Sequence, residues 1–92
     1  MEPLHVSASN AVWRALSQQP ASAGKVKFAW QLAAGPALSR AGIPRWSENG
    51  TLRIRAKSQE WKREIERARP LLRERLSQML GPDVVTRIVV EG

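Results

Sequence analysis

The clearest pattern of apolar and polar positions lies between residues 51 and 57, where apolar and basic residues alternate. The apolar positions are Leu52, Ile54 and Ala56, and the basic positions are Arg53, Arg55 and Lys57. A period of two residues places the two sets on opposite faces of a β-strand. The pattern therefore predicts a half-buried strand over Thr51–Lys57, with a row of positive charge on its solvated face.

The dipeptide Asn49-Gly50 precedes this strand. These residue types tolerate positive φ at both central positions of a tight turn, so the dipeptide predicts a hairpin. The first strand of the hairpin should cover Ile43 to Glu48. Pro44 has no backbone N–H to donate, which places this strand at an edge of the sheet or makes it begin near the proline.

Apolar residues recur near the helical period over residues 25–41, which predicts a helix. Gly35-Pro36 interrupts the pattern, because proline fits the first turn of a helix but breaks a helix interior. We therefore expect a helix to about Ala34, followed by a kink or a second short helix to Arg40.

A second helical pattern covers Gln59–Leu80, with apolar residues three or four positions apart. These positions are Trp61, Ile65, Ala68, Leu72, Leu76 and Leu80. Ser58 suits the N-cap, and Gly81 followed by a proline ends the pattern. Pro70 lies inside it and should divide it into two helices or kink one. The β-branched run Val84–Val90 then predicts a third strand.

The order helix, strand, strand, helix, helix, strand predicts an α+β fold with a three-stranded sheet. A short helix over residues 10–18 precedes these elements. We therefore divide the chain into an N-terminal segment, residues 1–24, and a folded domain, residues 25–92. The crossover through the later helices should return the third strand to the sheet and place the helices on one face. The other face should stay open to solvent.

The composition excludes several classes of protein. The chain has 92 residues, no cysteine and one histidine, so it is one small domain without a disulfide framework, a thiolate metal site or a histidine cluster. The longest apolar run is too short to cross a membrane, and the N-terminus lacks the pattern of a signal peptide, which favours a cytoplasmic location. No mutually supporting acid, base and nucleophile indicate catalysis, and we expect no enzyme activity, cofactor or metal.

The charge points to a polyanionic partner. The formal net charge is +7, and 11 of the 15 basic residues are arginine. Arginine binds phosphate and carboxylate groups in a bidentate manner and stacks on flat groups. Nucleic acid is therefore the favoured partner, ahead of an anionic membrane or an acidic protein surface. The alternative is a charge that only keeps the protein soluble.

Six basic residues follow the hairpin or belong to the third strand, and we predict that they contact phosphates. They are Arg53, Arg55, Lys57, Lys62, Arg63 and Arg87. The alternative for them is ordinary solvation of a one-sided sheet. Among the four tryptophans, Trp46 lies beside Arg45 and is the one expected to be exposed, where it could stack on a base or contact a partner. Trp30 and Trp61 fall on core positions of their helices.

Three blocks of the chain together resemble the DciA-like family of bacterial replication proteins. The blocks are Trp30…Gly35, Asn49-Gly50-Thr-Leu-Arg-Ile-Arg-Ala-Lys-Ser-Gln-Glu-Trp61 and Leu80-Gly81-Pro-Asp-Val-Val-Thr-Arg-Ile88. The family pattern has a tryptophan and a glycine in its first helix region, a Gly-x-Leu-x-Val-x-Ser-x-x-Trp-like segment and a Leu-Gly…Ile ending. Ile54 and Ala56 stand where the family usually has valines.

The resemblance implies a domain similar to a type II KH fold that binds single- or double-stranded DNA. It also implies recruitment or loading of the hexameric, DnaB-type replicative helicase. KH proteins clamp a nucleic-acid backbone with a Gly-x-x-Gly loop, whereas this chain has Arg67-Ala68-Arg69-Pro70 at the corresponding junction. DNA binding should therefore use another surface.

Two other functions stay open at this point. One is an RNA-binding module, which the charge and the KH-like order favour. The other is a protein-interaction domain without nucleic acid, such as a weak homo-oligomer formed at the open edge of the third strand.

Overall fold

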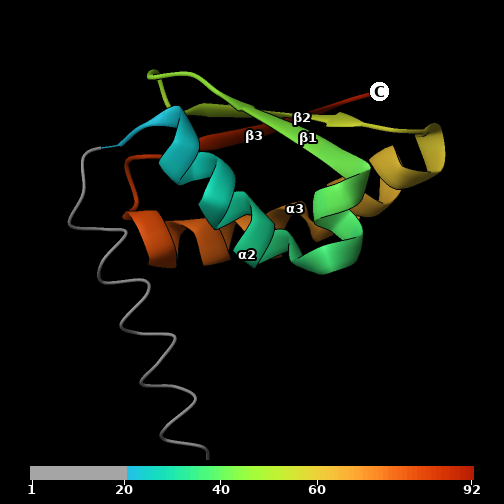
Figure 1. The fold of residues 1–92 in the computed structure, drawn as a ribbon, viewed down its shortest axis with the longest axis horizontal. Coiled ribbons are helices and arrows are strands. Elements are labelled where there is room, and N and C mark those ends of the chain that lie inside the picture. The colour runs from blue at the N-terminus through green and yellow to red at the C-terminus, as the bar shows by residue number, and fades with distance from the viewer. Residues whose placement is uncertain (1–20) are drawn as a thin grey trace, which may run out of the picture.

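The computed structural model describes residues 21–92. The elements are α2 (Ala23–Ala41), β1 (Gly42–Trp46), β2 (Thr51–Ala56), α3 (Gln59–Leu80) and β3 (Arg87–Glu91). The sheet forms one layer, and both helices form a second layer on one of its faces (Figure 1). The predicted α+β fold is confirmed. The helix predicted over residues 10–18 lies outside the described residues.

α2 begins at a cap and bends at a glycine. The Ser22 side chain accepts a hydrogen bond from the backbone N–H of Lys25 at 3.1 Å, which satisfies an amide that the first turn leaves unpaired. Gly35 has φ 81° and ψ 174°, and the helix resumes at Pro36. Proline needs no acceptor at the start of a helical segment, so the predicted kink is confirmed.

α3 is one continuous helix, so the predicted division at Pro70 is wrong. Pro70 cannot donate to the carbonyl of Glu66 one turn earlier, and both residues are exposed. Water can therefore reach the carbonyl that proline leaves free, while Ile65 and Leu72 on the opposite side stay buried in the core. Burial of that apolar side holds the helix together across the proline.

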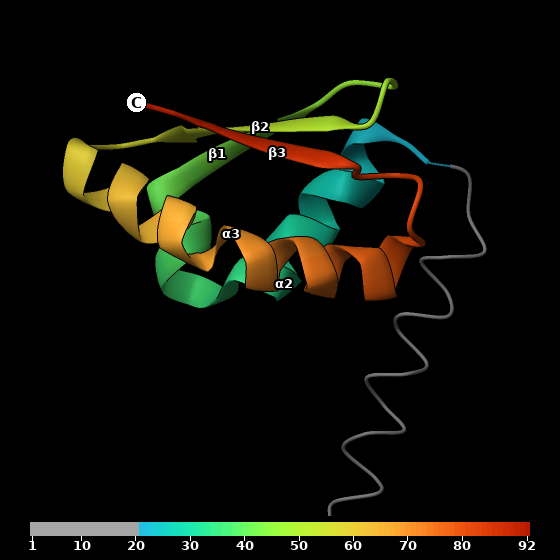
Figure 2. The same cartoon turned by 180° about the vertical axis from the view of Figure 1, so that it is seen from behind.

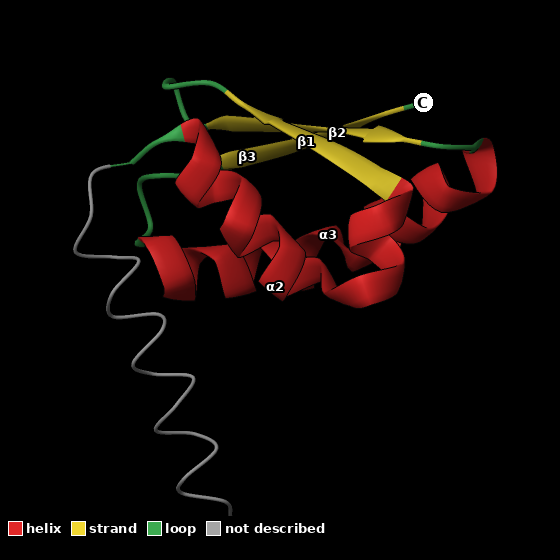
Figure 3. Ribbon diagram, in the orientation of Figure 1, coloured by secondary structure: helices red, strands yellow, loops and turns green. Residues whose placement is uncertain are grey.

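β2 is the central strand of the sheet. It pairs antiparallel with β1 and parallel with β3, in the order β1-β2-β3. The crossover through α3 brings β3 back beside β2, and both helices lie below the same face (Figures 2 and 3). Leu52, Ile54 and Ala56 face the helices and are buried, as their alternation predicted.

The hairpin turn differs from the prediction. The backbone N–H of Gly50 donates to the carbonyl of Ser47, so Glu48 and Asn49 are the central residues of the turn. Gly50 has φ 94°, and no residue other than glycine has positive φ in the described part of the chain. Asn49 instead accepts a hydrogen bond from the backbone N–H of Thr51 through its side-chain oxygen. β1 consequently ends at Trp46 rather than at Glu48.

β3 begins at Arg87, three residues later than predicted. Val84 and Val85 are β-branched, but they belong to the connection from α3. Val85 is buried there, and the carbonyl of Val84 accepts a hydrogen bond from a tryptophan of β1. Tertiary packing thus uses these valines outside the ladder.

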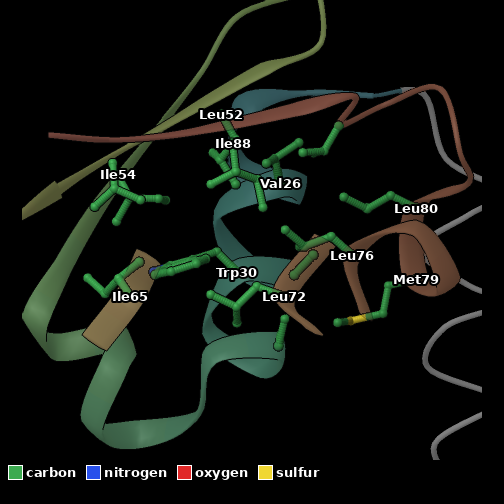
Figure 4. Packing of buried hydrophobic residues seen from close by; sticks show 14 of the residues in the cluster. Val26, Trp30, Leu52, Ile54, Ile65, Leu72, Leu76, Met79, Leu80 and Ile88 are labelled. Atoms are coloured by element: carbon green, nitrogen blue, oxygen red, sulfur yellow. The ribbon is translucent and has the colours of Figure 1, made fainter. Parts of the chain in front are cut away.

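The core lies between the sheet and the helices, with Trp30 near its centre (Figure 4). The indole N–H of Trp30 donates to the carbonyl of Gly42 at 3.3 Å. A Cβ at Gly42 would lie 2.5 Å from Cγ2 of Ile54 and 3.0 Å from Cδ1 of Ile65. Glycine therefore allows α2 to pass directly into β1 against the core.

Candidate nucleic-acid interface

The face of the sheet opposite the helices is uncovered and mostly basic. We call it the open face. Apart from the buried Thr51, its side chains are Ile43 and Arg45 of β1, Arg53 and Arg55 of β2, and Arg87, Val89 and Glu91 of β3. Arg53 and Arg55 therefore point away from the helices, as their alternation with apolar residues predicted, and Arg87 points to the same side.

Arg45 lies directly opposite Arg53 in the antiparallel register. Like charges in a cross-strand pair repel each other, and a bound anion between them would relieve that repulsion. A hollow at this place is lined by Ile43, Pro44, Arg45, Arg53, Arg55 and Glu91. The prediction for this face omitted Arg45, although its spacing from Ile43 could have identified it. The register that sets it against Arg53 required the structure.

One carboxylate reduces the charge of the open face. A terminal nitrogen of Arg53 donates to Glu91 Oε2 at 3.1 Å, and the two side chains are 47% and 49% exposed. Exposed pairs of this kind contribute about 0–1 kcal/mol to stability. The pair therefore affects the local charge more than it affects the fold.

Lys57, Lys62 and Arg63 lie near the start of α3, beyond the end of β2. Lys57 lines a hollow with Trp61 and with Ala37, Arg40 and Ala41 of α2. Lys62 is half-buried, and a Cβ at Gly92 would lie 3.2 Å from its Cδ. Arg63 is exposed on the helix. These cations extend the basic surface past the open face rather than joining its centre.

β3 is an edge strand, and its first residue, Arg87, lines a second basic hollow. Arg69, Pro70 and Arg73 of α3 line this hollow together with Thr86, Arg87 and Ile88. Arg69 and Arg73 are four residues apart, which places them on one side of the helix. No carboxylate lines the hollow, and in residues 21–92 none lies within 4.0 Å of these three arginines. Sequence reasoning did not join Arg69 and Arg73 to Arg87, because the hollow depends on how α3 packs below β3.

Two further arginines of α3 are engaged within the protein. Arg67 pairs with Glu64 one turn earlier at 3.3 Å. Arg75 donates to the carbonyl of Ala33 at 2.8 Å and thereby links α3 to α2. The arginine-rich helix is thus divided between structural contacts and charge that is available to a ligand.

The structure does not support Trp46 as an exposed stacking residue. Its position in the register places it on the helix-facing side with Leu52, where it is half-buried against the core. Its indole N–H donates to the carbonyl of Val84 at 2.9 Å. Trp46 therefore fastens the hairpin to the connection before β3. Trp61, which was expected in the core, is 36% exposed instead.

The described part of the chain contains neither a cluster of metal-ligating side chains nor a membrane-spanning helix. Within residues 21–92 no three His, Cys, Asp or Glu side chains come together as metal ligands would. No helix in that part of the chain has the length and apolar character needed to cross a membrane.

Comparison with known protein families decides the identity. The pattern of the family described as "Dna[CI] antecedent, DciA" matches residues 4–90, which is nearly the whole chain. The chain belongs to the DciA family. No curated protein and no solved structure matched it. The resemblance seen in the three sequence blocks is therefore confirmed.

DciA proteins are associated with loading of the replicative helicase, DnaB, in DNA replication. They are loaders and adaptors rather than catalysts. In this DciA protein the mixed sheet and its two covering helices present three basic surfaces. They are the open face, the hollow lined by Lys57 and Trp61, which we call the Trp61 hollow, and the hollow at Arg87.

Proposed function

We propose that this DciA protein is a DNA-binding adaptor with a KH-like domain that recruits or loads the DnaB-type helicase. The observation that carries the DNA-binding part is the open face, where Arg45, Arg53 and Arg55 line one hollow on an uncovered sheet. A surface of this kind can follow the phosphates of single- or double-stranded DNA without reading the bases.

The KH-like part of the proposal rests on the order of elements, with β2 and β3 parallel and joined through α3. The Gly-x-x-Gly loop of KH proteins has no counterpart here, because Arg67 to Pro70 continue α3 as regular helix. A helix at this point offers no flexible glycine backbone to a phosphate. Side chains of the open face therefore take the role of phosphate contacts.

Charge reversal tests the DNA-binding surface. In Arg53→Glu/Arg55→Glu we expect the slope of log Kd against log salt to fall by about 1.4 on single-stranded DNA, because each lost phosphate contact removes about 0.7. The affinity at about 0.1 M salt should fall at least roughly twentyfold. Fluorescence anisotropy with a labelled oligonucleotide measures both.

The matched control is Lys27→Glu/Arg67→Glu, which changes the net charge equally but lies outside the open face. Equal effects of the two double variants would show that only the total charge matters. An unchanged affinity and slope in Arg53→Glu/Arg55→Glu would show that DNA does not bind the open face.

The helicase part is tested by co-elution of the chain with the replicative helicase of its own organism on a sizing column at moderate salt. We expect the chain to move into the helicase peak. Tighter binding to structured RNA than to DNA at equal salt would instead favour an RNA-binding module. Self-association that is insensitive to salt, without nucleic-acid binding, would favour a homo-oligomer at β3, which has one neighbour in the sheet.

A further inference from the structure

The three tryptophans in the described part of the chain differ in their indole N–H groups. Trp30 and Trp46 donate to the backbone carbonyls of Gly42 and Val84. Within residues 21–92 the indole N–H of Trp61 has no acceptor in the protein. Trp61 is also 36% exposed, whereas Trp30 is buried and Trp46 is half-buried. Buried tryptophans usually satisfy this group, so Trp61 differs from a core residue both in exposure and in hydrogen bonding.

The start of α3 explains why Trp61 is exposed. Its backbone N–H donates to Oγ of the capping Ser58 at 3.2 Å, which fixes the residue in the first turn. Ile65, one turn later on the same side, is fully buried, whereas Trp61 lies beyond the edge of the core. The ring therefore stands beside the C-terminal part of α2.

The hollow at Trp61 is small and basic. Ala37 and Ala41 line it with short side chains, and Arg40 and Lys57 supply two cations, while no carboxylate is among its lining residues. The Nε of Arg40 donates to the carbonyl of Pro36 at 3.2 Å, so the terminal nitrogens of its guanidinium stay available. An aromatic face flanked by two cations fits a flat group that carries a phosphate.

We propose that the Trp61 hollow binds one unpaired base of single-stranded DNA, with the base stacked on the indole and Lys57 and Arg40 on neighbouring phosphates. This inference rests on the proposed DNA-binding function and adds a preference for single strands. In a duplex the bases stack on each other and their faces are not accessible, whereas each base of a single strand has a free face. The site thus distinguishes an opened strand from the duplex around it.

Substitution of Trp61 tests the proposal. Trp61→Leu should weaken binding of a labelled oligothymidine roughly tenfold, and Trp61→Phe should retain most of the affinity because it keeps an aromatic face. Binding of a duplex of equal length should change by less than about twofold, since no base face is offered. Fluorescence anisotropy measures the affinities, and circular dichroism checks that each variant is folded.

Phe28→Leu is the matched control. Phe28 is an aromatic residue of α2 that is 46% exposed and lies outside the hollow. Phe28→Leu should leave the affinities for oligothymidine and for the duplex unchanged. Arg40→Gln/Lys57→Gln keeps the tryptophan and provides a second test, in which the salt slope on oligothymidine should fall by about 1.4.

The outcomes separate this inference from the proposed function. Equal losses on single strand and duplex in Trp61→Leu, or an unchanged salt slope in Arg40→Gln/Lys57→Gln, would overturn the stacking site and leave DNA binding intact. Loss of co-elution with the helicase, with unchanged affinity for oligothymidine, would assign Trp61 to the protein partner instead. If the unmodified chain binds neither form of DNA, the proposed function and this inference fail together.

Discussion

Glu91 is a single residue that opposes anion binding on the open face, because it pairs with Arg53 at 3.1 Å. Arg45 and Arg53 repel each other across the ladder, and Glu91 partly offsets that repulsion. The same guanidinium cannot fully serve both Glu91 and a phosphate. The proposed binding of DNA to this face would therefore compete with an internal ion pair.

We predict that Glu91→Gln strengthens DNA binding, by about fivefold at roughly 0.1 M salt, because one more cation becomes available to a phosphate. The free energy of unfolding should change by less than about 1 kcal/mol, since the pair is half-exposed. Anisotropy and urea denaturation measure the two effects. Weaker DNA binding in Glu91→Gln would mean that the carboxylate positions Arg53 rather than masking it.

Gly42 is a second residue whose effect can be stated from its surroundings. Gly42→Ala should lower the free energy of unfolding by about 1–3 kcal/mol, because the new Cβ would overlap Ile54 and approach Ile65 in a packed core. Gly24→Ala is the control: nothing lies within 4 Å of its Cβ, and alanine favours the helix. Urea denaturation should show a lower free energy of unfolding for Gly42→Ala and an unchanged or higher one for Gly24→Ala. Equal free energies of unfolding for the two variants would show that the core adjusts to a side chain at Gly42.

Proline has a different structural effect in each of the two helices. In α2 the glycine before Pro36 leaves the helical region, and Pro36 begins a new helical segment where its missing N–H has no cost. In α3 Pro70 lies in the interior of a regular helix and removes a hydrogen bond. The exposed position of Pro70 limits the cost, because water can reach the free carbonyl.

Pro70→Ala should therefore raise the free energy of unfolding, by about 1–2 kcal/mol, since a full hydrogen bond to Glu66 is regained and alanine suits a helix interior. Pro36→Ala should change it by well under 1 kcal/mol, because that N–H finds no helical acceptor. Thermal unfolding, monitored by circular dichroism, compares the stabilities of the two variants. Destabilisation by Pro70→Ala would show that the ring of Pro70 contributes packing in the hollow with Arg69 and Arg73.

For the whole molecule, the net charge of +7 spreads over the open face and the two hollows. If Arg45, Arg53 and Arg55 of the open face and Arg40 and Lys57 of the Trp61 hollow each contact one phosphate, the affinity for single-stranded DNA should follow salt with a slope of about −3.5. Raising the salt from about 50 to about 200 mM would then weaken binding roughly 130-fold. A flat dependence, measured by anisotropy over this range, would exclude phosphate contact as the main contribution.

The alternation over residues 51–57 determined which residues of β2 are buried, because a strand that is covered on one face has a strict period of two. The cap at Ser58, the helix-ending Gly81 and the break at Gly35 are likewise local effects of backbone chemistry that the sequence predicted. The three sequence blocks identified the DciA family, and the charge predicted a polyanionic partner.

Tertiary structure decided what depends on contacts between distant segments. The continuity of α3 through Pro70 follows from burial of its opposite side, which no local propensity describes. The exposure of two tryptophans was also decided by distant contacts. Trp46, expected to be exposed, is half-buried because its indole N–H donates to the carbonyl of Val84, 38 residues away. Trp61, expected in the core, is exposed because it lies beyond the edge of the core. The hollow that joins Arg69 and Arg73 to Arg87 exists because α3 packs beneath β3. Sequence patterns predicted the type of each element, whereas long-range packing determined which elements are neighbours and which basic side chains share a surface.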